Sequence, residues 1–279
     1  MSWSIRCLVS AVASLGLAQS AVAADLDFLR GSDIFSPGPA AYYRWSGFYF
    51  GGDVGVGRAD AEFGKGADNL LIATIQQTIF SKQLVGFTSF VPPLSPDNAS
   101  STLFGGFAGY NTQWESAILG VEVGYHAASL DASAASSSVR FAVLGLPNGG
   151  ALSADLAKSS LIRFNDYATF RARAGWAFGC FLPYATLGLA VGRADIMNFA
   201  RVHFISFDQN GNPTGELNLP NTEVKHDQLN LGFATGVGVD VMLWSGLFAR
   251  AEYEFIDFTK FGDHKLSMNT VRGGLGYRF

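Results

Sequence analysis

Alternation of apolar and polar residues runs through much of the chain from residue 47 onward. In the last nine residues the apolar side chains share one parity and the arginines share the other: Val271, Leu275, Tyr277 and Phe279 against Arg272 and Arg278. Successive side chains of a strand point to opposite faces. This period of two therefore predicts a strand with one apolar and one polar face, ending on an aromatic residue.

The same pattern predicts eight strands, over residues 47–59, 102–112, 116–127, 166–178, 182–194, 228–243, 246–257 and 268–279. Each is long enough to cross an outer membrane, for which a tilted strand needs about 9–11 residues. Tight turns at 113–115, 179–181 and 244–245 alternate with long connections at 60–101, 128–165 and 195–227, and the connection at 258–267 is intermediate. Such alternation is typical of outer-membrane barrels. We predict an all-β fold, an eight-stranded antiparallel up-and-down transmembrane β-barrel with long extracellular loops.

The charged residues of these strands fall on the face opposite the apolar one. Because a lipid-facing Arg at the bilayer midplane costs about 2–4 kcal/mol, the polar face must line the interior. Eight strands leave only enough room for side chains to fill that interior, so its charges must pair or be hydrated. The predicted lumen ion-pair network joins acidic and basic side chains in equal number: Asp53, Glu122, Asp240, Glu252 and Glu254 with Arg171, Arg173, Arg250, Arg272 and Arg278.

Tryptophan and lysine separate along the chain. Beyond the N-terminal segment, all tryptophans fall at the ends that carry short turns: Trp45, Trp114, Trp176 and Trp244. This placement predicts a periplasmic aromatic girdle. All six lysines lie in or beside the long connections, where they could pair with lipopolysaccharide phosphates. A solvated surface is an equally open interpretation.

The N-terminus has the features of a secretory signal peptide. Arg6 precedes an apolar stretch, and Ala21 to Ala23 form a small-residue cleavage site. We predict a signal peptide over 1–23, a periplasmic leader over 24–46 and a barrel domain over 47–279, located in the cell outer membrane. Beyond residue 23 no apolar run is long enough for a transmembrane helix. The formal net charge of −4 and the lack of a basic stripe predict no nucleic-acid partner.

Three patterns in the sequence are candidates for catalysis, metal binding or interaction. The four histidines, His126, His203, His226 and His264, lack metal-ligand spacing, and polar residues of the barrel rim are the simpler interpretation. Glu252 and Glu254 could form a hydrolytic carboxylate pair, but partners of interior arginines explain them more simply. We predict no catalytic residue, cofactor or metal. In the first long connection, Leu71, Ile75 and Ile79 have helical spacing. They predict a short helix that packs against other loops, or one that caps the barrel or contacts lipopolysaccharide or a partner.

Three segments resemble one family. WSGFYFGG at 45–52 resembles the opening strand of small alphaproteobacterial outer-membrane barrel proteins of the porin-like RopB type, which include major surface antigens. GGFAGYNTQW at 105–114 with LGVE at 119–122 resembles their second and third strands, and GGLGYRF at 273–279 resembles their closing strand. The resemblance implies an eight-stranded barrel with structural or surface-interaction roles and no agreed enzymatic activity. The long loops depart from shorter members.

These observations leave three functions open. The first is an outer-membrane barrel with a role in envelope integrity and surface interaction, in contact with outer-membrane lipid and lipopolysaccharide. The second is a porin-like diffusion channel for small solutes, which requires the interior charges to line water. The third is a lipid A-modifying or proteolytic enzyme at the rim. The barrel-assembly machinery should recognise the terminal strand through Val271, Leu275, Tyr277 and Phe279. The sequence does not specify the oligomeric state.

Overall fold

The computed structural model describes residues 43–78, 81, 88–89, 91–136, 140–144 and 150–279. Within these ranges the elements are β1 (Gly47–Glu62), α2 (Gly66–Gln76), β2 (Asp97–Trp114), β3 (Ala117–Ser136), β4 (Arg140–Leu144), β5 (Ala151–Trp176), β6 (Phe181–Phe207), β7 (Pro213–Trp244), β8 (Leu247–Phe261) and β9 (His264–Arg278). The predicted signal peptide and residues 24–42 of the predicted leader lie outside the described residues. Among the helices of the described ranges, none is long and apolar enough to cross a membrane.

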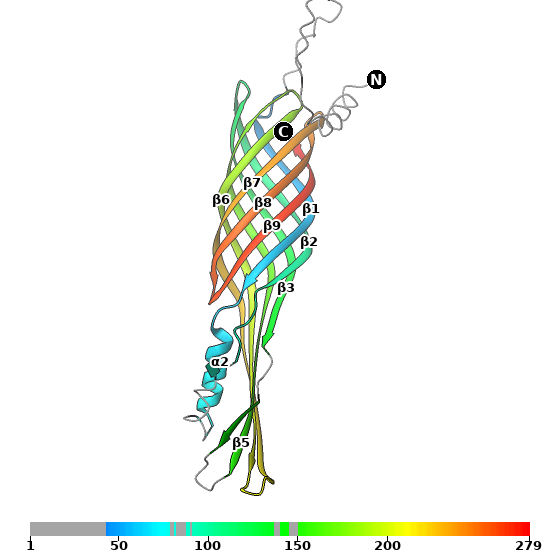
Figure 1. The fold of residues 1–279 in the computed structure, drawn as a ribbon. Coiled ribbons are helices and arrows are strands. Elements are labelled where there is room, and N and C mark those ends of the chain that lie inside the picture. The colour runs from blue at the N-terminus through cyan, green and yellow to red at the C-terminus, as the bar shows by residue number, and fades with distance from the viewer. Residues whose placement is uncertain (1–42, 79–80, 82–87, 90, 137–139, 145–149) are drawn as a thin grey trace, which may run out of the picture.

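Eight of these strands form a closed antiparallel ring (Figure 1). The order around the ring is β1–β2–β3–β5–β6–β7–β8–β9, and β9 pairs with β1 to close it. β4 is a short extra strand on β5, beyond the point where β3 ends. The predicted eight-stranded antiparallel barrel is confirmed. Closure gives every strand of the ring two neighbours, so the ring has no open edge.

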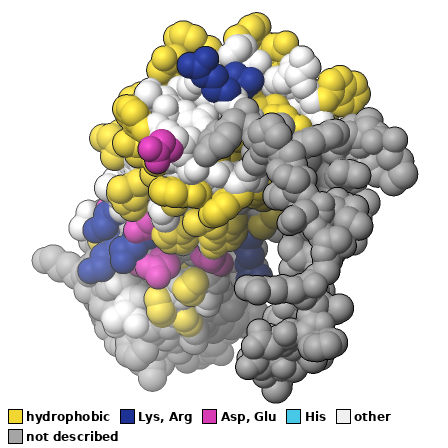
Figure 2. All heavy atoms as spheres, turned by 90° about the horizontal axis from the view of Figure 1, so that it is seen from above, with side chains coloured by type: hydrophobic (Ala, Val, Ile, Leu, Met, Phe, Trp, Pro, Cys, Tyr) yellow, Lys and Arg dark blue, Asp and Glu magenta, His cyan; other side chains and the backbone are white. Residues whose placement is uncertain are grey.

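The wall has the predicted phase. On β1 the outward side chains of Phe48, Phe50, Val54 and Val56 are between 53% and 68% exposed. On β3, the side chain of Glu122, which points to the inner face, is 1% exposed. Seen along the barrel from the end at which the C-terminus lies, hydrophobic side chains gather on the visible part of the wall (Figure 2). The apolar face therefore points outward and the charged face points into the lumen.

The prediction of long irregular loops at 128–165 and 195–227 is wrong. β3, β5, β6 and β7 continue beyond the ring and form a tall sheet that projects from the barrel (Figure 1). The sequence pattern hid this because the pairing shifts register between Phe164 and Asp166 on β5, and again where β7 passes His226. At each irregularity the odd-numbered and even-numbered residues exchange faces of the strand. The alternation of apolar and polar residues is interrupted there, so the sequence pattern predicts the end of the strand. The connection expected at 258–267 is instead a tight turn at Gly262 and Asp263.

The helix expected in the first long connection is present as α2, although Ile79 lies outside the described residues. Leu71 and Ile75 are fully buried and pack against Leu156 of β5 and Val202 of β6. At the first turn of the helix, Asp68 forms an ion pair with the buried side chain of Lys158. The helix therefore packs against the segments that were predicted as the other long connections, and its contact with lipopolysaccharide or a partner stays a prediction.

Candidate functional site

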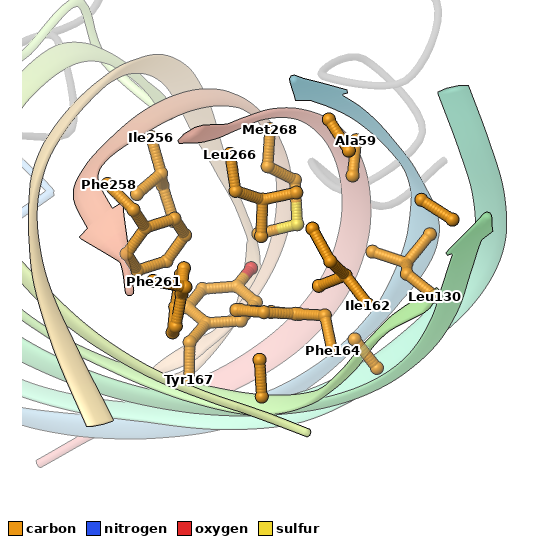
Figure 3. Packing of buried hydrophobic residues seen from close by; sticks show 14 of the residues in the cluster. Ala59, Leu130, Ile162, Phe164, Tyr167, Ile256, Phe258, Phe261, Leu266 and Met268 are labelled. Atoms are coloured by element: carbon orange, nitrogen blue, oxygen red, sulfur yellow. The ribbon is translucent and has the colours of Figure 1, made fainter. Parts of the chain in front are cut away.

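The barrel lumen is filled in three layers. At the end with short turns, an apolar cluster includes Trp45, Ile118, Leu182, Met242 and Phe248. At the opposite end, a second apolar cluster brings together side chains from all eight strands of the ring. Figure 3 shows how they point toward one another inside the ring: Ala59, Leu130, Ile162, Phe164, Tyr167, Ile256, Phe258, Phe261, Leu266 and Met268. The charged side chains lie between these two clusters.

Arg171 connects three carboxylates of the charged layer. Its guanidinium donates from Nη1 to Glu252 at 2.7 Å and to Glu254 at 2.6 Å, and from Nη2 to Glu122. These four side chains are at most 2% exposed. A planar guanidinium can serve several carboxylates at once because its five N–H donors point outward in one plane.

Arg250 and Arg173 extend the network toward β7. Arg250 donates to Asp240 at 2.9 Å and to Glu122 at 2.7 Å, and Arg173 also bonds Asp240. The guanidinium of Arg173 lies 3.6 Å from the ring centre of Tyr184. Each buried charge therefore has an opposite charge or an aromatic face against it, which offsets part of its desolvation penalty.

Arg272 joins the network to a buried histidine. It pairs with Glu252, lies 3.1 Å from Glu254 and approaches His126 Nε2 to 2.9 Å. The same His126 nitrogen lies 3.1 Å from a carboxylate oxygen of Asp53. The layer thus contains five carboxylates, four arginines and one histidine, all contributed by strands of the ring.

Arg278 lies outside the charged layer, so its predicted place in the ion-pair network is wrong. Its guanidinium bonds the backbone oxygens of Ser46 and Phe279, each at 3.2 Å. Its parity is inward, but it lies six residues beyond Arg272 on β9, about 20 Å at the rise of a strand. The apolar cluster around Trp45 separates it from the carboxylates. His126, which was predicted as a residue of the barrel rim, lies instead in the charged layer between Arg272 and Asp53.

The predicted place of Trp45 in the periplasmic girdle is also wrong. Its side chain lies in the lumen at 1% exposure, 6.3 Å between ring centres from Phe248, and not in the girdle. The reason is local: Trp45 precedes β1, and its backbone N–H donates to Gln113 at 2.6 Å, which turns the chain into the barrel mouth. The other three tryptophans project outward with 52% to 66% exposure: Trp114, Trp176 and Trp244.

Sequence reasoning missed the tyrosines of the charged layer. Tyr49 donates to Glu122 at 2.8 Å, Tyr184 to Glu252 at 2.7 Å and Tyr167 to Glu254 at 3.3 Å. Their inward parity was the available signal, because a buried phenol requires an acceptor. These hydroxyl groups satisfy carboxylate lone pairs that the arginines leave open.

The glutamates and histidines that were candidates for chemistry have partners within the chain. Glu252 and Glu254 are bonded to arginines at 2% and 0% side-chain exposure, out of reach of a substrate. His203 lies between Asp155 and Glu216 on the tall sheet. In the described part of the chain, no group of three or more His, Cys, Asp or Glu is arranged to hold a metal ion.

A belt of ion pairs lies on the outer wall of β3, β5 and β6, where the ring meets the tall sheet. Arg163 pairs with Asp131 at 2.9 Å, and Arg193 pairs with Asp166. Asp195 accepts the backbone N–H of Asp227, and this hydrogen bond lowers the pKa of the Asp195 carboxyl. Below the belt the exposed wall is apolar. On β9, Val271, Leu275 and Tyr277 are outward and between 42% and 57% exposed, and Phe279 follows the strand at 68%.

A family model, a relative from Brucella ovis and several solved structures are similar to this chain. A family model described as outer membrane protein beta-barrel domain matches residues 10–279. The 25 kDa outer-membrane immunogenic protein of Brucella ovis is 24% identical over 193 residues, which cover 69% of each chain. Similar solved structures include neisserial surface protein A (14% identity, TM-score 0.38, 84% of this chain and 98% of that chain) and OprG of Pseudomonas aeruginosa (16%, 0.36, 84% and 96%). Ail, the attachment invasion locus protein of Yersinia pestis, is 15% identical with a TM-score of 0.31, over 84% of this chain and 99% of that chain.

Proposed function

Because the chain belongs to the outer membrane protein beta-barrel domain family, we propose that it serves the cell outer membrane, where it is located, as a sealed structural barrel that presents a surface sheet. The role assigned is envelope integrity and surface interaction, without solute transport and without a reaction. The observation that carries the proposal is the filled lumen. A buried, mutually bonded charge layer lies between two apolar clusters.

A filled lumen favours a sealed barrel over a channel. A conducting pore needs charges that line water, as the porin-like alternative requires. Here the charged side chains of the layer are at most 4% exposed and bond one another. A hydrated ion that entered from either end would first meet an apolar cluster, where losing its hydration is costly.

The tall sheet supports the surface-interaction part of the proposal. It extends the wall on the side of the long connections, which we assign to the cell exterior because outer-membrane barrels place long connections there. α2 packs on one face of this sheet, and the charged belt lies at its base. We further propose that Trp114, Trp176 and Trp244 form the periplasmic girdle in contact with outer-membrane lipid.

Purified protein in a planar lipid bilayer should give no reproducible conductance steps. Insertion is verified separately by protection of the barrel from added protease. Stable steps whose ion selectivity changes on Arg173→Gln would contradict the proposal and favour the diffusion channel. Arg173→Gln is informative because Arg173 is fully buried in the charged layer and pairs with Asp240.

Deleting Phe279 should lower the amount of protein assembled in the outer membrane severalfold. The backbone N–H of Phe279 bonds Phe48 at 2.9 Å, and its ring contacts those of Phe50 and Tyr277 at the β9–β1 closure. We propose that the barrel-assembly machinery recognises this terminal strand. The measurement is immunodetection in isolated outer membranes. Phe178→Ala, which removes another exposed aromatic ring, is the control and should assemble normally. Normal levels of the truncated chain would contradict the prediction.

A further inference from the structure

A groove of about 550 Å³ crosses the outer wall from β6 to β1. Its floor follows one row of paired residues that runs across five strands: Asp60, Ser267, Asp257, Phe233 and Leu189. Glu62 and Lys265 border it at the β1 and β9 end, where they pair at 3.7 Å. On β8, Thr259 borders the groove and donates to the backbone oxygen of Leu231 at 3.0 Å.

The two ends of the groove differ in polarity. At the β6 and β7 end, Leu189, Leu231 and Phe233 are 49% to 58% exposed and continue the lipid-facing wall. At the β8, β9 and β1 end the outward side chains are charged or carry hydroxyl groups. The groove therefore has an apolar half and a polar half on one continuous surface.

The apolar half lies deeper in the membrane than the polar half. On β1 the apolar wall ends at Val56, before Arg58, whereas β7 is apolar at Phe233 and Leu231 and as far as Leu229. Barrel strands tilt, so a row of paired residues runs obliquely to the membrane plane. Because the membrane boundary is level around the barrel, the row descends from Asp60 on β1 toward Phe233 on β7. The groove then runs from headgroup height into the acyl chains.

The polar half has an excess of negative charge. Asp60, Glu62 and Asp257 face one cation within the groove, Lys265. Arg58 lies 3.8 Å from Asp60. Asp257 is exposed next to Phe233, and no ion pair or hydrogen bond of its side chain is found among the described residues. A carboxylate at the edge of a lipid layer is costly without a counter-cation.

We propose that this groove binds one outer-leaflet lipid whose zwitterionic headgroup carries a primary amine. The acyl chain lies over Leu189, Leu231 and Phe233, and the amine pairs with Asp257. An anionic lipid without an amine fits less well, because the three carboxylates of the groove outnumber its cations even when Arg58 is counted with Lys265. This site lies outside the lumen and is independent of whether the barrel conducts.

Native mass spectrometry of the purified protein in detergent tests the proposal with dioleoyl phosphatidylethanolamine and dioleoyl phosphatidylglycerol as probes. The two lipids share acyl chains and differ in the amine. Wild-type protein should retain the amine-bearing lipid about fivefold more than the anionic one, the effect of about one partly exposed charge pair. Asp257→Asn should reduce this preference to about onefold, because it removes the charge and keeps the shape.

A steric variant and a charge control complete the experiment. Ser267→Trp fills the middle of the groove and should reduce retention of both lipids. Glu216→Gln removes an exposed carboxylate on the tall sheet, far from the groove along β7, and should leave the preference unchanged. A migration shift on unheated gels establishes that each variant is folded. Equal retention of both lipids by wild type, or a preference that survives Asp257→Asn, would overturn the proposal. So would retention of phosphatidylglycerol that requires Mg²⁺ and is lost with EDTA, because it would assign the groove to cation-bridged phosphate.

Discussion

Arg171→Met should lower the free energy of unfolding by about 3–5 kcal/mol, the effect of removing one partner from a buried ion pair. Methionine keeps an unbranched apolar stem and removes the guanidinium. The loss arises from the carboxylates of Glu122, Glu252 and Glu254, which lose a shared cation at exposures of 2% or less. Arg250 and Arg272 still contact these groups, so the network is weakened and not abolished.

Denaturant unfolding in lipid vesicles, followed by tryptophan fluorescence, measures this effect. The matched control is Arg163→Met, which removes the same group from a pair with Asp131 on the exposed belt. Solvent screens that pair, so the control should change stability far less. If Arg171→Met were no more destabilising than Arg163→Met, the charged layer would be hydrated, and the case for a sealed lumen would fail.

Phe258→Ala should lower the free energy of unfolding by about 3–5 kcal/mol, the usual range for truncating a buried aromatic side chain. Phe258 is 1% exposed and belongs to the second apolar cluster of the lumen, which lies at the end opposite the short turns and is called the outer cluster below. Its ring centre is 5.3 Å from that of Phe164 and 5.4 Å from that of Phe261 (Figure 3). The strands around it belong to a closed ring that cannot collapse to fill the space, so the substitution leaves a cavity.

Phe233→Ala is the control for this second prediction. Phe233 lies on the lipid-facing wall at 49% exposure, where acyl chains move into vacated space. Phe233→Ala should therefore lower the free energy of unfolding less than Phe258→Ala does in the same experiment. Equal losses for the two variants would show that the outer cluster is loosely packed, contrary to the structure.

The fold was accessible from the sequence where the signal was local. Side chains of a strand alternate with a period of two, so β1, β8 and β9 could be located and their faces assigned from consecutive residues. The large penalty for a lipid-facing Arg then selected the inward phase for Arg171 and Arg173. The pattern was lost at the bulges of β5 and β7, where one irregular position reverses parity and the strand continues beyond the barrel.

The partners within the lumen depend on positions far apart in the chain. Arg250 meets Glu122 across 128 residues of sequence, and His126 meets Asp53 across 73. The sequence supplies the charges and their parity, but the register of eight strands decides their height in the barrel. For this reason Arg278, with inward parity, remains outside the network, and Trp45 enters the lumen although the other tryptophans face outward.

By itself, then, the sequence determined a membrane barrel with an apolar exterior and a charged interior, because both follow from alternation within single strands and from the cost of placing charge in lipid. The tertiary structure alone decided that apolar clusters lie at both ends of the interior, that tyrosines complete the charged layer, and that four strands continue into a sheet against which α2 packs. It also decided that an amphipathic groove crosses the outer wall. Each of these depends on the stagger and tilt of neighbouring strands, which no single segment encodes.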